Sequence, residues 1–474
     1  MNIQVSPTVT NGSHGSVSGG DNYLIELLQQ CQKGVEISHN VETLHVTSLL
    51  QEIRDRASSI LRQSTLPTTK IEEWRFTDLS ALKQFSFQVA APTGLPAALV
   101  TPLTFSEAAN SRLVFINGVY APEHSAIGDL PKGVVVSNLS GLPAEYRDRL
   151  DNYLAKSEGR EEIFTALNTA GIMDVAVVWI PKNVVVETPI HLLFIANSFR
   201  TPTIQQPRCL VVAETGSSVT LVEDYLNQFN IEDPEEGEAE VGETVYFTNA
   251  VTEIWLGENA QVRHTRVERE SVEAFHIGKT AITQARDSRY TCNAITLGAK
   301  LSRHNLEIFQ TGEQTETNLN GLTMIAGQQT ADTHSAIALN YPYSMSRQLH
   351  KCIVADKAHT VFNGRVFVAK AAQLTDAGQL NRNLLLSPKA RVDTKPQLEI
   401  IADNVKCSHG ATVSQLEDDE IFYLQSRGIN AADAQNLLVN AFAAEIINQL
   451  PIPSLQQTLL KAVTREATTL NLAD

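Results

Sequence analysis

A cysteine and a histidine two residues apart, Cys407 and His409, offer the clearest chemistry in this sequence. In an extended strand, alternate side chains lie on the same face, so both would point in one direction. A thiolate and an imidazole on one face are suitable ligands for iron, zinc or an iron–sulfur cluster. Most pairs at this spacing are structural, so the pair by itself leaves ligation and ordinary packing both open.

Two further patterns resemble functional sites but are incomplete. The run EAFHIGKT at residues 273–280 is similar to the end of a phosphate-binding loop, yet Glu273 replaces its first glycine. A carboxylate at that position would repel phosphate, so we expect no ATP binding by this chain. His350 and Cys352 repeat the same two-residue spacing and are interpreted as ordinary strand residues.

The overall composition argues against several classes of protein. The chain has 474 residues and a formal net charge of −16, from 37 basic and 53 acidic side chains, which disfavours nucleic acid and anionic membrane as partners. Its five cysteines are scattered, as expected for free thiols in a reducing compartment, and three are interpreted as small buried side chains: Cys31, Cys209 and Cys292. No apolar run is long enough to cross a bilayer and no secretory signal is present, so a cytoplasmic protein is predicted.

The first part of the chain is predicted to contain a tail and a helical region. Residues 1–20 are rich in Ser, Gly, Asn and Thr and are expected to be disordered. Residues 21–110 form the N-terminal helical region, because apolar side chains recur at three- and four-residue steps in 23–32 and 42–63.

Residues 111–412 are predicted to form a mainly β core domain. Short apolar or β-branched runs are separated by turn residues, and no amphipathic helix of ordinary length occurs between 205 and 412. This pattern predicts a sandwich, a barrel or a β-helix. Three glycines recur at a spacing of 41, which favours a stacked β-solenoid in which each turn buries its apolar face on its neighbours: Gly216, Gly257 and Gly298.

The C-terminal region at 413–474 returns to a helical pattern. A helix at 417–427 ends at Gly428, a second begins after Asn430 and reaches about residue 450, and a third covers 454–470. Four apolar side chains follow each other at i, i+4 steps along the second helix: Leu438, Phe442, Ile446 and Leu450. This row could pack onto the β-domain or form a docking face, and removal of the helices is expected to leave the solenoid folded.

Longer runs form an ordered set of motifs from the N-terminal region to the C-terminus: EEWRFTDL at 72–79, LVFINGVY at 113–120, TDAGQLNRNLLLS at 375–387, KPQLEI at 395–400, NVKCSHGATV at 404–413 and FYLQSRGI at 422–429. Together they resemble the SufB/SufD family of iron–sulfur cluster assembly scaffolds, and its SufD branch in particular. One departure separates the two branches, because Ala390 stands where the SufB branch carries a cluster-building cysteine. An alanine cannot bind metal, so the resemblance implies a chain that does not assemble a cluster alone.

The resemblance implies a β-helix fold and a non-catalytic scaffold in a SufB–SufC–SufD complex. The chain would pair with a SufB-like paralogue through its last strands, from about residue 361 to 413, and would form a homodimer there when SufB is absent. Its C-terminal helices would dock SufC, an ABC-type ATPase. A nascent iron–sulfur cluster would be shared with SufB, with His409 as a ligand and Cys407 as a weaker one, while the isolated chain would hold no stable cofactor. The structural alternative is that His409 only hydrogen-bonds across the interface.

A cytoplasmic β-helix could instead be a carbohydrate-active enzyme, whose chemistry usually needs paired carboxylates across a groove. The predicted strands lack recurring pairs of acidic residues, and seven carboxylates are concentrated at 231–243. That run is interpreted as a solvated loop, with transient capture of iron as the alternative. Trp74, in the run at 72–79, is flanked by charges and is interpreted as an anchored structural turn with no chemistry of its own.

Overall fold

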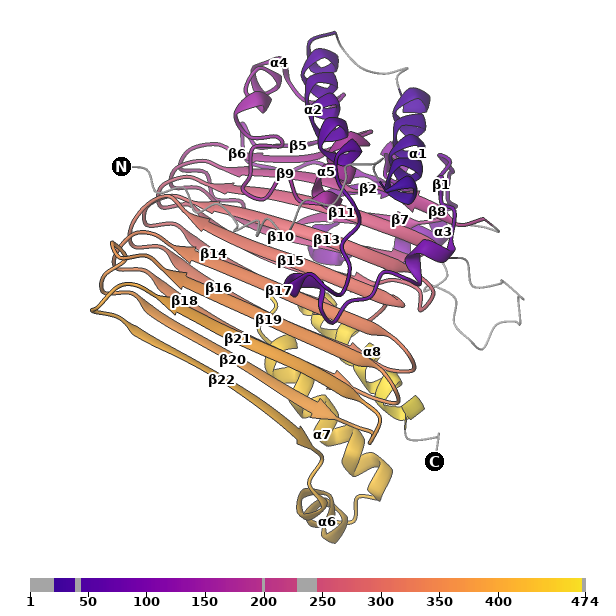
Figure 1. Cartoon of the computed structure of the whole chain (residues 1–474), viewed down its shortest axis with the longest axis vertical. Coiled ribbons are helices and arrows are strands. Elements are labelled where there is room, and N and C mark those ends of the chain that lie inside the picture. The colour runs from indigo at the N-terminus through magenta and orange to yellow at the C-terminus, as the bar shows by residue number, and fades with distance from the viewer. Residues whose placement is uncertain (1–20, 39–43, 198–200, 228–244, 471–474) are drawn as a thin grey trace.

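The strands of this protein alternate along the chain between two parallel sheets, so that each turn of the chain adds one strand to each sheet (Figure 1). The computed structural model describes residues 21–38, 44–197, 201–227 and 245–470. The tail predicted at 1–20 and the acidic run at 231–243 lie outside the described residues. Two stacked parallel sheets wound in this way form a β-solenoid, which confirms the predicted fold class.

The first sheet, called sheet A, ends on β21 and the second, called sheet B, ends on β22. Sheet A contains, in chain order, β1 Gln88–Val89, β5 Val135–Ser137, β6 Ala176–Ile180, β8 Thr203–Gln205, β9 Arg208–Ala213, β11 Tyr246–Leu256, β13 Phe275–Gln284, β15 Leu301–Gln310, β17 Thr330–Leu339, β19 His359–Val368 and β21 Arg391–Ile400. Sheet B contains β2 Ser111–Ile116, β3 Val119–Tyr120, β4 Ala126–Ile127, β7 Ile190–Ala196, β10 Ser218–Asn227, β12 Gln261–Arg269, β14 Arg289–Thr296, β16 Glu316–Ile325, β18 Met345–Val354, β20 Asp376–Leu385 and β22 Lys406–Gln415.

The corners between the sheets account for the turn residues seen in the sequence. Asn259, between β11 and β12, and Asp287, between β13 and β14, occupy the left-handed region, which short polar side chains tolerate. The repeat is shorter than the predicted spacing of 41, because Gln261 pairs with Arg289 and these residues are 28 apart. Gly257 lies at the corner between β11 and β12, whereas Gly298 lies at a corner between β14 and β15, so the equal glycine spacing does not mark the turns.

The helices cover the N-terminal turns and one outer face of the solenoid (Figure 1). The N-terminal helices are α1 Asn22–Ser38, α2 Leu44–Arg62, α3 Ala97–Val100, α4 Ala144–Arg147 and α5 Ile163–Ala170, and single-turn 3-10 helices lie at Glu72–Trp74, Leu82–Gln84, Thr101–Leu103, Ser106–Ala108, Pro122–His124 and Leu150–Asn152. As predicted, the described residues contain no helix between 205 and 412. No helix of the described chain has the length and apolar character needed to span a bilayer.

Three C-terminal helices follow β22: α6 Asp418–Ser426, α7 Ala431–Ile447 and α8 Pro453–Leu470. Gly428 has a φ of +89° and its N–H donates to Gln425 O, while Ile429 N–H donates to Leu424 O, so α6 ends in the predicted cap. The Asn430 side chain accepts the Asp433 N–H and caps α7.

Helices α7 and α8 pack their apolar sides onto the outer face of sheet B. Their buried side chains share one cluster with strand residues that include Val222, Leu322 and Ile353. Ile446 and Leu450 belong to this cluster. These two members of the predicted apolar row therefore pack onto the β-domain. The expectation that the solenoid stays folded without these helices remains a prediction, although their removal would expose the apolar face of sheet B to water.

This packing predicts a contrast between two aliphatic residues of α7. Ile446 is fully buried in the cluster, so Ile446→Ala should lower the free energy of unfolding by about 2–5 kcal/mol. Leu437 is 51% exposed, so Leu437→Ala should change it by less than about 0.5 kcal/mol. Urea unfolding followed by circular dichroism measures both; equal losses would contradict the packing.

Candidate functional site

The solenoid ends at β21 and β22, whose outer edges pair with no strand of the described chain. We call these two edges the open end. Lys406 N–H donates to Thr375 O, so the even-numbered residues of β22 bond to β20. The alternate residues direct both N–H and C=O to the open edge: Cys407, His409, Ala411, Val413 and Gln415. These unpaired groups can add a strand from another chain.

The edge of β21 carries one fewer donor than that of β22. Arg391 N–H donates to Ala358 O, so Arg391 and every second residue after it bond to β19. Pro396 falls on an intervening position, where its missing N–H removes a donor from the open edge. The two edges therefore differ, and β22 is the more complete template for strand addition.

Cys407 and His409 lie on β22 at the open end, on one side of the strand as the sequence predicted. Their lateral neighbours on β20 are Ala377 and Gln379, whose side chains are buried in the solenoid. Cys407 is half-buried and packs against the main core cluster, whereas His409 is exposed. Among the described residues no group of three or more His, Cys, Asp or Glu could hold a metal ion. Within the described residues, Cys407 and His409 therefore belong to no group of three such side chains.

Burial raises the pKa of the Cys407 thiol, and the nearby Asp376 carboxylate raises it further, while a hydrogen bond with the Ala377 backbone acts in the opposite direction. The thiol is therefore protonated at neutral pH and must lose its proton to bind iron. Ala390 lies in the corner before β21 and packs with apolar residues that include Val354 and Val392. It supplies no ligand.

The other four cysteines and His350 are buried side chains. Cys31, Cys209, Cys292 and Cys352 are buried, as expected for small core side chains. His350 stacks on the Phe362 ring with centroids 5.0 Å apart, which confirms its interpretation as an ordinary strand residue.

Sequence reasoning could not decide whether other histidines converge, and the structure places two of them in buried acid–base pairs. His264 Nε2 lies 3.0 Å from Glu223 Oε2, and His276 Nδ1 lies 2.6 Å from Glu270 Oε2. Burial alone lowers the pKa of His264, but hydrogen bonds to Cys292 and Glu223 raise it to about 9. Burial lowers the pKa of His276 to about 3 and raises that of Glu270 to about 8, so this second pair is neutral at pH 7.

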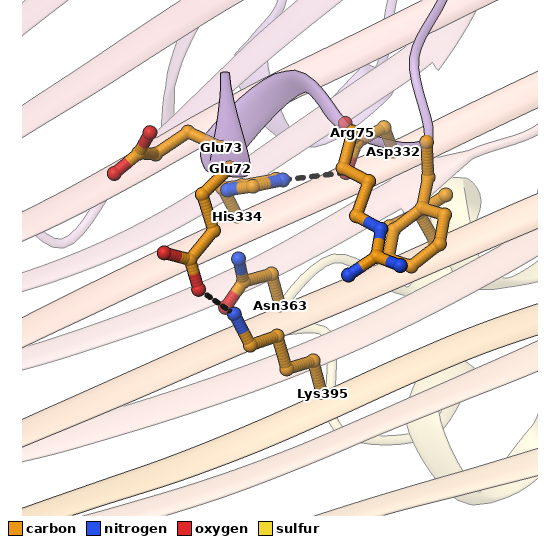
Figure 2. Close-up of a pocket in the computed structure, with 9 residues that line it drawn as sticks. Glu72, Glu73, Arg75, Asp332, His334, Asn363 and Lys395 are labelled. Carbon is orange, nitrogen blue, oxygen red and sulfur yellow. Dashed lines mark hydrogen bonds and ion pairs between the residues drawn. The ribbon is translucent and has the colours of Figure 1, made fainter. Parts of the chain in front are cut away.

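The segment around Trp74 crosses the outer face of sheet A and forms a small cavity (Figure 2). Trp74 is buried against Arg303, whose guanidinium carbon lies 3.9 Å from the ring centroid. Asp332 accepts hydrogen bonds from Arg303 and Thr77 and lies 2.9 Å from His334 Nε2. These contacts confirm the interpretation of the run at 72–79 as an anchored turn.

The tip of this turn reaches the penultimate strand of the chain. Figure 2 shows Glu72 extending to Lys395 of β21, with which it forms an ion pair. The cavity between them has a volume of about 60 Å³ and is lined also by His334 and Asn363. Nothing in the sequence indicated that Glu72 contacts Lys395. The contact depends on how the turn at 72–79 lies over the outer face of sheet A.

The predicted docking row is divided between interior and surface, and its last member, Leu450, lies beyond the end of α7 at Ile447. Ile446 and Leu450 are buried, and Leu438 and Phe442 are half-buried. Three other large apolar side chains of the C-terminal helices are exposed: Phe422 at 70%, Tyr423 at 57% and Leu437 at 51%. We call these three residues the exposed helical patch. Sequence reasoning assigned no docking role to Phe422 and Tyr423, which lie on α6, a helix with no buried residue.

Comparison with known proteins gives two family matches that together span most of the chain. Residues 194–442 match the model described as SUF system FeS cluster assembly, SufBD core domain, and residues 25–192 match the SufBD protein N-terminal region. An iron–sulfur cluster assembly SufBD family protein of Synechocystis sp. is 50% identical over 418 residues, covering 88% of this chain and 91% of that protein. The iron–sulfur cluster assembly protein SufD of Escherichia coli is 32% identical, covering 85% of this chain and 90% of that protein. The chloroplast protein ABCI7 of Arabidopsis thaliana is 37% identical, covering 85% and 83%.

The burial of the thiols predicts an order of alkylation. Cys407 is the one cysteine of the five that is not buried, so iodoacetamide should modify it first in the folded chain. Because its pKa is raised, modification should be slow at pH 7 and should accelerate as the pH rises toward and beyond 9. Mass spectrometry of timed samples measures this, with the urea-unfolded chain as control. Rapid modification at pH 7, or earlier modification of Cys209, would contradict the site geometry.

Proposed function

This chain belongs to the SufBD family of iron–sulfur cluster assembly proteins, and from that premise we propose that it is a non-catalytic scaffold subunit of a SufB–SufC–SufD complex. In this complex it pairs with a SufB-like paralogue and binds the SufC ATPase. The observation that carries the proposal is the open end, where unpaired strand edges and the Cys407–His409 pair occur together.

The paralogue pairs through the open end, chiefly by adding a strand to β22. Five consecutive outward positions of β22 have free N–H and C=O groups, whereas Pro396 interrupts the edge of β21. Since paralogues of one family share a fold, a second copy of this chain offers the same edge and forms a homodimer when SufB is absent. Both pairings bury His409 at the interface.

His409 is a ligand of the nascent cluster, with Cys407 as a weaker companion. His409 is exposed at the open end and can reach a partner, while the half-buried Cys407 thiol is protonated at pH 7. Ala390 provides no thiolate, so the main thiolate comes from the SufB-like partner. The cluster is cargo shared across the interface, and the isolated chain holds no cofactor stably.

SufC binds the C-terminal helices through the exposed helical patch. The patch faces solvent, while the opposite sides of α7 and α8 are fixed to sheet B. Lys351 of β18 is buried beneath α7, donates to Phe442 O at 2.8 Å and forms an ion pair with Glu445. A movement imposed on α7 by SufC is therefore transmitted directly to β18, within the sheet that ends at His409.

The competing function, a carbohydrate-active enzyme, is not favoured. The carboxylates that line the cavity in Figure 2 include Glu72, paired with Lys395, and Asp332, paired with Arg303. Glu73 is the third carboxylate of the lining, so two of the three are held in ion pairs rather than free for acid–base chemistry. The cavity volume of about 60 Å³ is also far below the ~300–1,000 Å³ of typical small-molecule sites.

The ligand role predicts the effect of two substitutions in the co-expressed complex. His409→Ala should leave the complex intact on gel filtration but reduce cluster accumulation sharply, because an imidazole ligand is lost. Cys407→Ser should have a milder effect. Iron and sulfide content per complex measures both. Normal cluster content with His409→Ala would refute the ligand role, and dissociation of the complex would favour the structural role of His409.

The docking role predicts that Phe422→Ser combined with Tyr423→Ser weakens SufC binding without unfolding the chain. Burial of each large apolar side chain contributes roughly 1.5–3 kcal/mol, so the dissociation constant should rise at least about tenfold. Isothermal titration calorimetry with purified SufC measures it. Tyr343→Ser is the matched control, since Tyr343 is 55% exposed at a solenoid corner. Equal affinity of the double variant and the wild type for SufC would show that the exposed helical patch is not part of the SufC interface.

A further inference from the structure

Gln379 is the buried neighbour of His409 across the last strand pair. The register of β20 and β22 places Gln379 laterally opposite His409, and both side chains lie on the interior side of sheet B. Gln379 is 3% exposed, whereas His409 is exposed. An exposed proposed ligand thus lies directly beside a buried amide.

The Gln379 amide is held in place by hydrogen bonds that run into the solenoid. Its Nε2 donates to Gln348 Oε1 at 2.8 Å, and Gln348 Nε2 donates to Ser335 Oγ of sheet A at 2.7 Å. The end of the side chain lies over Gly364 of β19, where a Cβ atom would collide with it. The Nε2 group of the Gln379 amide is therefore hydrogen-bonded within the interior of the solenoid.

The other end of the amide has no partner. Gln379 Oε1 is buried and accepts no hydrogen bond from the described chain. A buried acceptor left unpaired costs about 1–3 kcal/mol, so its retention requires an explanation. Of the two proposed ligands, only His409 has a hydrogen-bonding side chain as its lateral neighbour, because the neighbour of Cys407 is Ala377.

We propose that Gln379 is a positioning residue for His409. When the exposed His409 ring turns toward the interior side of sheet B, Gln379 Oε1 accepts its Nδ1–H, the ring nitrogen nearer the backbone, and Nε2 is left unprotonated. Histidines that bind metals are commonly oriented by such an acceptor on their second nitrogen. The inference deepens the proposed function, because it states how the scaffold prepares this ligand before iron arrives.

The tautomer of His409 tests the inference without any cluster. The full chain is labelled with ¹⁵N-histidine, its ring nitrogens are observed by long-range ¹H–¹⁵N correlation, and His409 is assigned by loss of its signals in His409→Asn. The wild type should show the Nδ1–H form. Gln379→Met, similar in size but without an acceptor oxygen, should shift His409 toward the Nε2–H form that imidazole prefers in water. Gln379→Glu retains an oxygen and should restore Nδ1–H.

Asn383→Leu is the matched control. Asn383 is a buried amide on the same strand whose Oδ1 is also unpartnered, but its lateral neighbour is Val413. This variant should leave the His409 tautomer unchanged. The same tautomer in the wild type and Gln379→Met, or an equal shift in Asn383→Leu, would overturn the inference.

Iron content of the co-expressed complex separates this inference from the proposed function. If both hold, Gln379→Met should lower the affinity of the site for iron(II) by roughly 10- to 100-fold. If the tautomer shifts as stated but His409→Ala leaves iron binding unchanged, Gln379 positions His409 and the ligand role alone is wrong. If His409→Ala abolishes iron binding but the His409 tautomer is the same in the wild type and in Gln379→Met, the ligand role stands and the positioning role is wrong.

Discussion

A parallel two-sheet solenoid must end on strands whose backbone groups have no partner, and the rest of this structure depends on how each end meets that constraint. At the first turns the sheets close with short antiparallel strands: β5 pairs with β6, and β3 and β4 pair with β2. Apolar helical segments also cover these turns. At the last turn, β21 and β22 remain uncovered within the described chain. This asymmetry gives the molecule one end suited to association, and Cys407 and His409 lie there.

The body of the solenoid connects this end to the surfaces far from it. The turn at Trp74 is anchored on β15 and β17 through Arg303 and Asp332 and reaches β21 through Lys395. On the other face, α7 is fixed to β18 through Lys351. The strands of the last turns therefore contact the Trp74 turn on the outer face of sheet A and α7 on the outer face of sheet B. A displacement of the C-terminal helices can be transmitted to the open end through packed strands rather than through a flexible linker.

Much of this fold follows from local patterns in the sequence. Turn residues between short β-branched runs predict a sandwich, a barrel or a β-helix, and the family resemblance selects the β-helix. The caps at Gly428 and Asn430 depend only on neighbouring residues. The Cys407–His409 pair follows from the two-residue period of a strand. Lateral contacts could not be predicted, because the pairing of His409 with Gln379 depends on the combined lengths of two corners and one strand. The same is true of the apolar row on α7, where burial is decided by the position of the helix on sheet B.

In the proposed complex, the SufB-like partner adds its own strand to the edge of β22. Amide hydrogen exchange, resolved to single residues of β22, measures this directly. In the isolated chain, the outward N–H groups of Cys407, His409, Ala411 and Val413 should exchange fast, and those of the inward residues slowly. On complex formation the outward amides should become protected. Unchanged exchange at these four positions, with new protection only on α1 and α2, would contradict it.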